Sequence, residues 1–201
     1  MQERVVILVL SLVVAASLSG CSSAVGPAGR TAADSTSTTG SQPAPAATAL
    51  TFSGKYGVTF NYPVGWTVVT PRLQETKTAD GSVSTFVRFE RAGVGYMEVY
   101  GAVASQGHDA AAAEASNKAY VANLEKLWKL GGQKFKKITV AGLPGVYYKG
   151  APYRTGYSVI CMAFKDLSIV QASGQTTSTA AVTQKELVDA VALVTSTIRL
   201  R

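Results

Sequence analysis

The stretch Tyr157-Ser158-Val159-Ile160-Cys161-Met162-Ala163-Phe164 decides the fold, because it is apolar almost throughout. Side chains of a strand alternate between two faces, so a run without polar alternation predicts a strand covered on both sides. Such a strand belongs at the centre of a sheet. We expect Cys161, within this run, to be a small buried residue, since no basic or histidine neighbour in the sequence would activate its thiol.

Alternating patterns before and after this run predict further strands. Val58, Phe60 and Tyr62 are separated by polar Thr59 and Asn61, which is the period of a half-buried strand. Short turn-forming stretches join the segments, so the first four are expected to form an antiparallel meander. The expected strands lie near 58–62, 66–70, 83–90, 96–104, 134–140, 145–150, 155–164 and 167–173, with connections at 142–145 and 165–166.

Two segments with helical spacing interrupt the strands. Asp109 is a good N-cap for the alanine-rich run after it, and Gly131-Gly132 is a typical helix end. Thr183 and Glu186 have the spacing of a capping box for a closing helix. The apolar stripes are Tyr120, Leu124, Leu127 and Trp128 in the first helix, and Leu187, Val188, Val191, Val194 and Ile198 in the second.

This order of elements predicts an α+β domain, in which helices pack on an antiparallel sheet. The stretch Tyr56-Gly57-Val58-Thr59-Phe60-Asn61-Tyr62-Pro63-Val64-Gly65-Trp66 resembles the start of PsbP-like domains, and Ala141-Gly142-Leu143-Pro144-Gly145-Val146-Tyr147-Tyr148 resembles their second half. The resemblance implies an α/β/α sandwich over residues 50–201, with about six antiparallel strands and a non-enzymatic accessory role. Some plant members are described as binding metal through histidines. This chain has one histidine, so that property is not carried over.

The amino terminus has the layout of a secretory signal. Val5 to Leu18 is almost wholly apolar, and Leu18-Ser19-Gly20-Cys21 resembles the lipobox of bacterial lipoproteins at all four positions. The resemblance implies removal of a signal peptide, residues 1–20, after Gly20, and attachment of diacylglycerol to Cys21. An uncleaved membrane helix is the alternative, but fourteen helical residues rise only about 21 Å, short of the roughly 30 Å hydrocarbon core. We therefore expect a lipid-anchored protein on the extracytoplasmic side of the cell membrane.

Residues 21–49 follow the anchor as a stretch rich in Ser, Thr, Ala and Pro. Such a composition buries too little apolar surface to offset its ordering entropy, so we expect a disordered tether. A flexible coil of this length spans roughly 30 Å on average. The expected organisation is a signal peptide, a tether carrying the lipidated Cys21, and one globular domain over 50–201.

The net charge of +7 comes from 19 basic and 12 acidic residues. Part of the excess is the cluster Lys126, Lys129, Lys134, Lys136 and Lys137. It is either a surface for anionic lipids or polymers of a cell envelope, or a solvated helix end and strand face. Nucleic acid is a poor partner for a chain with an export signal.

Candidate catalytic residues are few. His108 would be a general base if an acid paired with it; otherwise it is a loop residue beside the capping Asp109. Glu90 and Glu98 on neighbouring strands resemble the carboxylate pair of glycosidases, although their alternation favours solvated positions. No Cys, His, Asp or Glu cluster has the spacing of a metal site, so neither metal nor cofactor is expected.

Tyrosines offer a further possibility, because they suit both a sheet–helix interface and a binding surface. Tyr96 and Tyr100 share one face of a strand. Tyrosines of later strands would form a ligand groove if they gathered with Lys149 and Arg154; packing in the core is the alternative for most of them. The later tyrosines are Tyr147, Tyr148, Tyr153 and Tyr157.

Three functions remain open from the sequence. The first is a non-catalytic accessory or binding lipoprotein for an envelope protein or polymer. The second is a carrier of a lipid or other amphiphile in a cavity between sheet and helices. The third, an envelope hydrolase, has the least support, because it depends on the single imidazole of His108.

Overall fold

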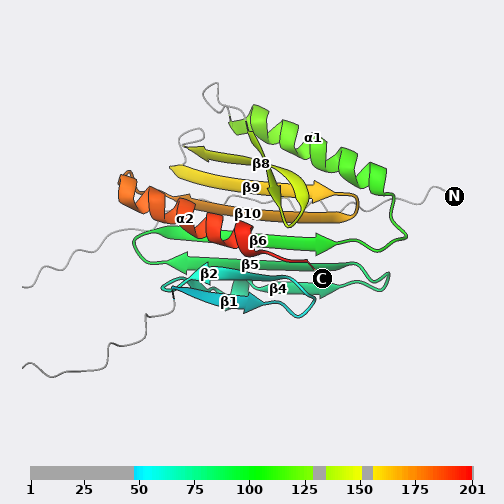
Figure 1. Ribbon diagram of the computed structural model, residues 1–201, viewed down its shortest axis with the longest axis horizontal. Coiled ribbons are helices and arrows are strands. Elements are labelled where there is room, and N and C mark those ends of the chain that lie inside the picture. Colours follow the sequence, from blue (N-terminus) through cyan, green and yellow to red (C-terminus); the bar gives the residue numbers. More distant parts are fainter. Residues whose placement is uncertain (1–47, 129–134, 151–155, 201) are drawn as a thin grey trace, which may run out of the picture. The chain divides into compact units, whose positions relative to one another are not determined.

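The computed structural model describes residues 48–128, 135–150 and 156–200 (Figure 1). They form an α+β fold with one eight-stranded sheet, in the order β3-β5-β6-β10-β9-β8-β7 with β4 also pairing with β5, and a separate β1–β2 pair. Each strand pairing is antiparallel, as expected. The strands are β1 (Ala49–Ser53), β2 (Thr59–Pro63), β3 (Thr67–Val68), β4 (Gln74–Lys77), β5 (Val83–Arg91), β6 (Gly95–Val103), β7 (Lys136–Val140), β8 (Leu143–Gly150), β9 (Tyr157–Lys165) and β10 (Ser168–Thr176); the helices are η1 (Thr70–Arg72), α1 (Ala110–Trp128) and α2 (Ala181–Thr197).

The sheet has eight strands among the described residues, so the expectation of about six was wrong. The additional strand β4 consists of Gln-Glu-Thr-Lys and lacks the alternation of apolar residues that predicts a strand. It forms because its backbone pairs with β5, with Gln74 opposite Phe86. The connection expected over 142–145 is also shorter than predicted. β8 already begins at Leu143, and Ala141 and Gly142, both with positive φ, form the turn.

Strand β9 holds the central place that its apolar run predicted. It lies between β10 and β8, and both of its faces are buried. Val159, Cys161 and Ala163 belong to the main core on one face. Ile160 and Met162 point to the opposite face and are buried there.

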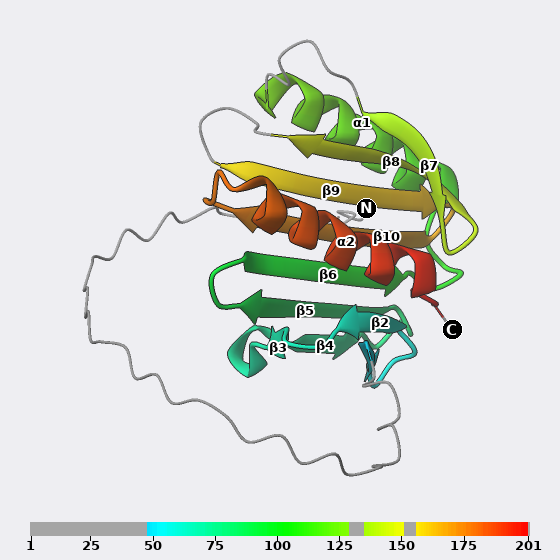
Figure 2. The same cartoon turned by 60° about the vertical axis from the view of Figure 1, so that its left-hand side comes forward.

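Helix α2 covers the Cys161 face of the sheet. Leu187, Val191 and Val194 are at most 1% exposed, and Figures 1 and 2 show the helix lying across β10. Glycine at 174 in β10 permits this close approach, since a Cβ there would lie 2.6 Å from Leu187 Cδ1. Gly101 of β6 likewise permits the close approach of Leu200, whose Cδ2 would lie 3.0 Å from a Cβ at position 101.

The capping box expected at the start of α2 was wrong. The helix begins at Ala181, so Thr183 lies inside its first turn. The N-cap is Ala180, which has extended dihedrals and makes no side-chain capping bond. Glu186 forms an ion pair with Arg91 at the end of β5 instead of reaching back to a cap. A tertiary contact thus replaces the predicted local one.

Helix α1 packs against β9, and its cap is the predicted one. Asp109 Oδ1 accepts hydrogen bonds from the backbone N–H groups of Ala111 at 2.9 Å and Ala112 at 3.1 Å. Leu124 is buried, whereas Tyr120 is only partly buried. Since Ile160 and Met162 are buried outside the α2 core, α1 covers the face opposite to α2. The predicted helix end at Gly131-Gly132 lies outside the described residues.

The β1–β2 pair lies near β4 and β5 (Figure 2). Aromatic rings join it to the sheet. The Phe60 and Phe89 ring centroids are 5.8 Å apart, and those of Tyr62 and Phe89 4.6 Å. The ring of Phe52 stacks on Phe60 at 5.0 Å. The alternation of Phe60 and Tyr62 predicted β2, whereas β1 was missed.

Candidate functional site

The sheet face that carries α1 is only half covered by it. On β9 that face is apolar and buried, as Ile160 and Met162 show. On β5, β6 and β10 most of the equivalent positions are polar or aromatic and partly exposed. We call this region the open face; it consists of Phe86, Arg88, Tyr96, Glu98, Tyr100, Gln171, Ser173 and Gln175.

Strand register brings the charged pair of the open face together. Arg88 of β5 lies opposite Glu98 of β6, and Ser173 of β10 lies on the other side of Glu98. Phe86 and Tyr100 form the next row. Directly opposite positions on one sheet face are close enough for their side chains to interact. The side chains of the open face therefore come from paired strands and not from loops.

Arg88 is the central residue of the open face. Its guanidinium carbon lies 3.8 Å from the centroid of the Tyr96 ring, a cation–π contact. Its Nη1 lies 3.6 Å from Glu98 Oε1, and its Nε lies 3.3 Å from Glu90 Oε1. The Arg88 side chain is 21% exposed. The guanidinium is thus held in place by a ring and two carboxylates while one part of it still meets solvent.

Glu98 is more buried than its sequence position suggested. Its side chain is only 14% exposed, against 57% for Glu90. Burial raises the pKa of Glu98, and the nearby guanidinium groups of Arg88 and Arg72 oppose that rise. The expectation that Glu90 and Glu98 are both solvated is therefore wrong for Glu98. Arg88 contacts both carboxylates, so the two acids do not stand as a free catalytic pair.

Tyrosines flank Glu98 on both sides along β6. Tyr96 donates a hydrogen bond to the side-chain oxygen of Gln175 across the β6–β10 pair. Burial raises the pKa of both Tyr96 and Tyr100, so both phenols are neutral at physiological pH. Neutral phenols, carboxamides and a fixed guanidinium supply flat contact surfaces with hydrogen-bonding edges. This combination suits recognition of a polar partner.

The other tyrosines of the expected groove do not join the open face. Tyr148 is buried on the α1 side of β8, with its ring 5.9 Å from that of Phe135. Tyr147 and Tyr157 pack against the main core on the opposite face. The remaining groove residues, Tyr153 and Arg154, lie outside the described residues. Sequence alternation identified Tyr96 and Tyr100, but it gave no sign that Arg88 stacks on Tyr96.

His108 pairs with an acid other than its sequence neighbour. Its Nε2 lies 2.6 Å from Oδ2 of Asp80, whereas Asp109 caps α1. Both members of the pair are nearly half exposed. Ser82 and Ser105 hydroxyls contact the carboxylate of Asp80 at 3.0 and 3.3 Å and do not contact the imidazole. The group joins the β4–β5 turn to the loop before α1, and both of its serines contact Asp80.

Asp80 is the acceptor that organises this group. Hydrogen bonds from the hydroxyl of Thr78, from His108 and from the backbone and side chain of Ser82 hold its pKa well below the usual range. The carboxylate is therefore ionised across the physiological pH range. Asp80 therefore stabilises the β4–β5 turn at the surface through these hydrogen bonds.

Cys161 is buried, as predicted. It is 2% exposed, and burial raises the pKa of its thiol to about 12. A thiol in this environment is not a nucleophile at neutral pH. Among the described residues, no group of three or more His, Cys, Asp or Glu side chains is placed to hold a metal ion.

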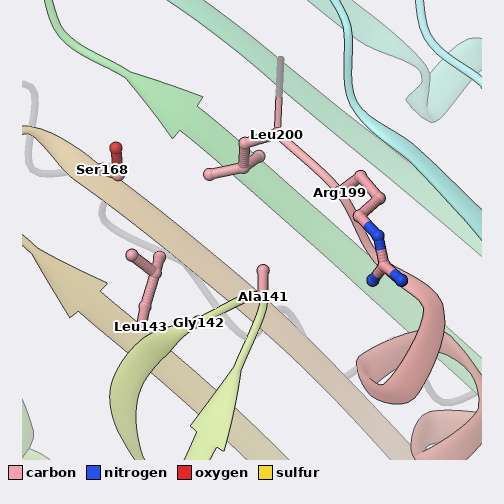
Figure 3. A pocket seen from close by; sticks show the side chains of 6 residues that line it. All are labelled: Ala141, Gly142, Leu143, Ser168, Arg199 and Leu200. Atoms are coloured by element: carbon pink, nitrogen blue, oxygen red, sulfur yellow. The ribbon is translucent and has the colours of Figure 1, made fainter.

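A pocket of about 440 Å³ lies at one end of the sheet, next to the β7–β8 turn (Figure 3). The chain after α2 supplies Arg199, whose Nη1 donates a hydrogen bond to the Ile198 carbonyl at 3.0 Å. Leu187, Val191 and Val194 of α2 are buried, and none of them lines the pocket. Its lining residues are Ala141, Gly142, Leu143, Ser168, Arg199 and Leu200.

The predicted processing site, Gly20 and Cys21, lies outside the described residues, as does most of the tether. Within the described part of the chain, no helix combines the length and apolar character needed to cross a membrane.

No family model and no curated protein matches this chain. A crystal structure of a protein from Bacteroides thetaiotaomicron, at 1.50 Å resolution, is similar with a TM-score of 0.38 and 13% sequence identity. The similar region covers 72% of this chain and 45% of that one, so the chain spans less than half of that protein's length.

Proposed function

We propose that this protein is a lipid-anchored extracytoplasmic binding protein that holds an envelope protein or polymer on its open face and performs no catalysis. The observation that carries the proposal is the placement of Arg88 between the Tyr96 ring and the Glu98 carboxylate on a half-covered sheet face. Arginine and tyrosine dominate the binding energy of protein interfaces. Here both are fixed on strands, so little side-chain entropy is lost on binding.

The anchor part of the proposal depends on Cys21 and the tether that follows it. Two acyl chains hold a protein stably at a bilayer, whereas one does so only marginally. A diacylated Cys21 would therefore keep the domain at the membrane without a spanning helix. The tether length, roughly 30 Å, would let the open face reach components near the surface.

We also propose a PsbP-like fold. Two helices on opposite faces of an antiparallel sheet support an α/β/α arrangement. So does the turn from Pro63 to Trp66, in which Gly65 has a positive φ and Trp66 N donates to the Pro63 carbonyl at 3.3 Å. Trp66 is 3% exposed and anchors this turn in the core.

A carrier of small amphiphiles is the second candidate, and the pocket beside Arg199 is the observation that favours it. Its volume, about 440 Å³, lies within the range of small-ligand sites. An anionic head group would suit the Arg199 guanidinium. We rank this second because the pocket lies at the end of the sheet and holds a single cationic side chain.

The test is a pull-down from detergent-solubilised envelopes of the source cells with the lipidated full-length protein. Tyr100→Ser removes one ring of the open face, and Tyr56→Ser, a matched loss of a partly buried ring near β2, is the control. A partner captured by wild type and Tyr56→Ser, but at least about tenfold less by Tyr100→Ser, would support the proposal. Equal capture by all three proteins, or no partner above background, would count against it.

A further inference from the structure

The basic residues of this chain are concentrated in one continuous segment. Residues 120–165 contain eight Lys or Arg and one Asp or Glu, a net charge of +7 that equals the net charge of the whole chain. The rest of the sequence is therefore electrically balanced. The segment includes the Lys126–Lys137 cluster, and it also includes Lys149, Arg154 and Lys165.

Folding keeps this charge together at one side of the sheet. The described part of the segment forms the second half of α1, the edge strand β7, and its neighbours β8 and β9. Lys136 and Lys137 lie on β7 opposite Tyr147 and Val146 of β8, and Lys149 follows two residues after Tyr147. Lys126 lies on α1, the helix that covers β9. We call Lys126, Lys136, Lys137 and Lys149 the basic edge.

The lysines of the basic edge are available to an outside partner. All four are exposed. The ion pairs between described residues involve other groups, such as Lys118 with Glu114 and Lys185 with Asp189. On the opposite side of the sheet, β4, β5 and β6 carry acidic and basic side chains in equal number: Glu75, Glu90 and Glu98 with Lys77, Arg88 and Arg91. The unbalanced positive charge is therefore located at the basic edge.

We propose that the basic edge docks on the anionic phospholipid headgroups of the membrane to which the protein is anchored. This inference rests on the proposed lipid anchor, because a tether of roughly 30 Å holds the domain permanently within reach of that surface. Clusters of four to eight basic residues held near an anionic bilayer are attracted to it, and the tether would supply that proximity for the basic edge. A lipid anchor and a basic patch also reinforce each other, because each keeps the domain close to the membrane surface that the other binds.

Docking through the basic edge leaves the open face accessible. The basic edge belongs to β7, β8 and α1, whereas the open face belongs to β5, β6 and β10. The two surfaces are separated by β9, whose residues on the open-face side are covered by α1. Docking would therefore fix the orientation of the open face without covering it.

The experiment uses the lipidated full-length protein reconstituted in vesicles of phosphatidylcholine alone, or of phosphatidylcholine with 30% phosphatidylglycerol. Brief acetylation followed by mass spectrometry reports the reactivity of each lysine. With phosphatidylglycerol, Lys126, Lys136, Lys137 and Lys149 should react at least about threefold more slowly, and 0.5 M NaCl should abolish the protection. Lys55 and Lys77, which lie outside the segment, should react equally in both vesicles. Equal rates at the basic edge would overturn the proposal.

Charge variants provide a second measurement. Changing the four lysines of the basic edge to Gln, or instead Lys55, Lys77, Lys118 and Lys185 to Gln, lowers the net charge by the same amount. Only the first variant, in the unacylated Cys21→Ser form, should lose its salt-sensitive sedimentation with vesicles that contain phosphatidylglycerol. Equal loss in both variants would show that net charge alone acts and would refute a located docking surface.

Two further outcomes are distinguishable. If mass spectrometry finds no acyl chains on Cys21, the anchor fails; sedimentation of the same chain with added vesicles then still measures the docking. If the chain binds polygalacturonate through the same four lysines but shows no protection on phosphatidylglycerol vesicles, the occupant is an anionic polymer, and the proposal for lipid is wrong.

Discussion

Gly174→Ala should loosen the contact between β10 and α2. A methyl group at position 174 would lie 2.6 Å from Leu187 Cδ1 and 3.1 Å from Leu187 Cγ. The leucine cannot move away freely, because it is fully buried and Val191 Cγ2 lies 3.3 Å from the same methyl position. Overpacking of this kind costs about 1–3 kcal/mol, and the lower backbone entropy of alanine returns about 0.4–1 kcal/mol.

We therefore expect Gly174→Ala to lower the free energy of unfolding by about 1–2 kcal/mol, or the Tm by about 2–8 °C for a domain of this size. Urea unfolding followed by the fluorescence of buried Trp66 measures it. Gly107→Ala is the matched control, since the nearest atom to its new methyl, Ser105 Oγ, is 3.9 Å away. That variant should change stability by less than about 0.5 kcal/mol.

A double-mutant cycle separates the steric effect from other causes. Leu187→Ala alone should cost about 3–5 kcal/mol, because it opens a cavity under α2. In that background the added methyl at position 174 meets no leucine, so Gly174→Ala should become neutral or slightly stabilising. If Gly174→Ala costs the same in both backgrounds, within about 0.5 kcal/mol, the proposed contact with Leu187 is not the cause.

The remaining predictions concern turns and titrating groups. Ala141→Gly should raise the Tm, because Ala141 has a φ of 52° that glycine adopts without strain, whereas Ala92→Gly, in a turn without positive φ at that residue, should lower it. Asp80→Asn should lower the Tm more at pH 7 than at pH 2: the depressed pKa of Asp80 means that its contribution is fully present above the unfolded value of 3.8 and declines as the pH falls toward the folded-state value. Burial raises the pKa of Glu98, so this residue stabilises the fold below the unfolded value of 4.5 and loses that contribution as the pH rises. Glu98→Gln should therefore reduce the fall in the free energy of unfolding just above pH 4.5, and an unchanged slope would contradict this. Cys161 should resist thiol reagents in the native protein and react after unfolding in urea, which a colorimetric thiol assay detects.

Patterns that depend on local periodicity could be predicted from the sequence. The apolar run around Cys161 correctly indicated a central strand, and Asp109 correctly indicated the start of α1. Strand β4 could not be predicted in this way. Its polar residues carry no periodic signal, and only backbone pairing with β5 makes it a strand.

In the candidate site, positions within one strand could be predicted from the sequence, whereas contacts between strands or loops could not. Tyr96 and Tyr100 were predicted to share a face because they lie four residues apart on one strand. That Arg88 stacks on Tyr96 and that His108 pairs with Asp80, rather than with its neighbour Asp109, could not be predicted. These contacts join different strands and loops, and register between them is set by the packing of the whole sheet.

By itself, the sequence determined the α+β class, the buried strand around Cys161, the capped first helix and the concentration of charge in residues 120–165, since each follows from neighbouring residues. Tertiary structure alone decided which polar groups meet. It joined Arg88 to Glu98 on a half-covered face, and it brought Lys149 next to the edge strand that carries Lys136 and Lys137. The physical reason is that backbone pairing and core packing act between segments far apart in the chain, where local periodicity carries no information about partners.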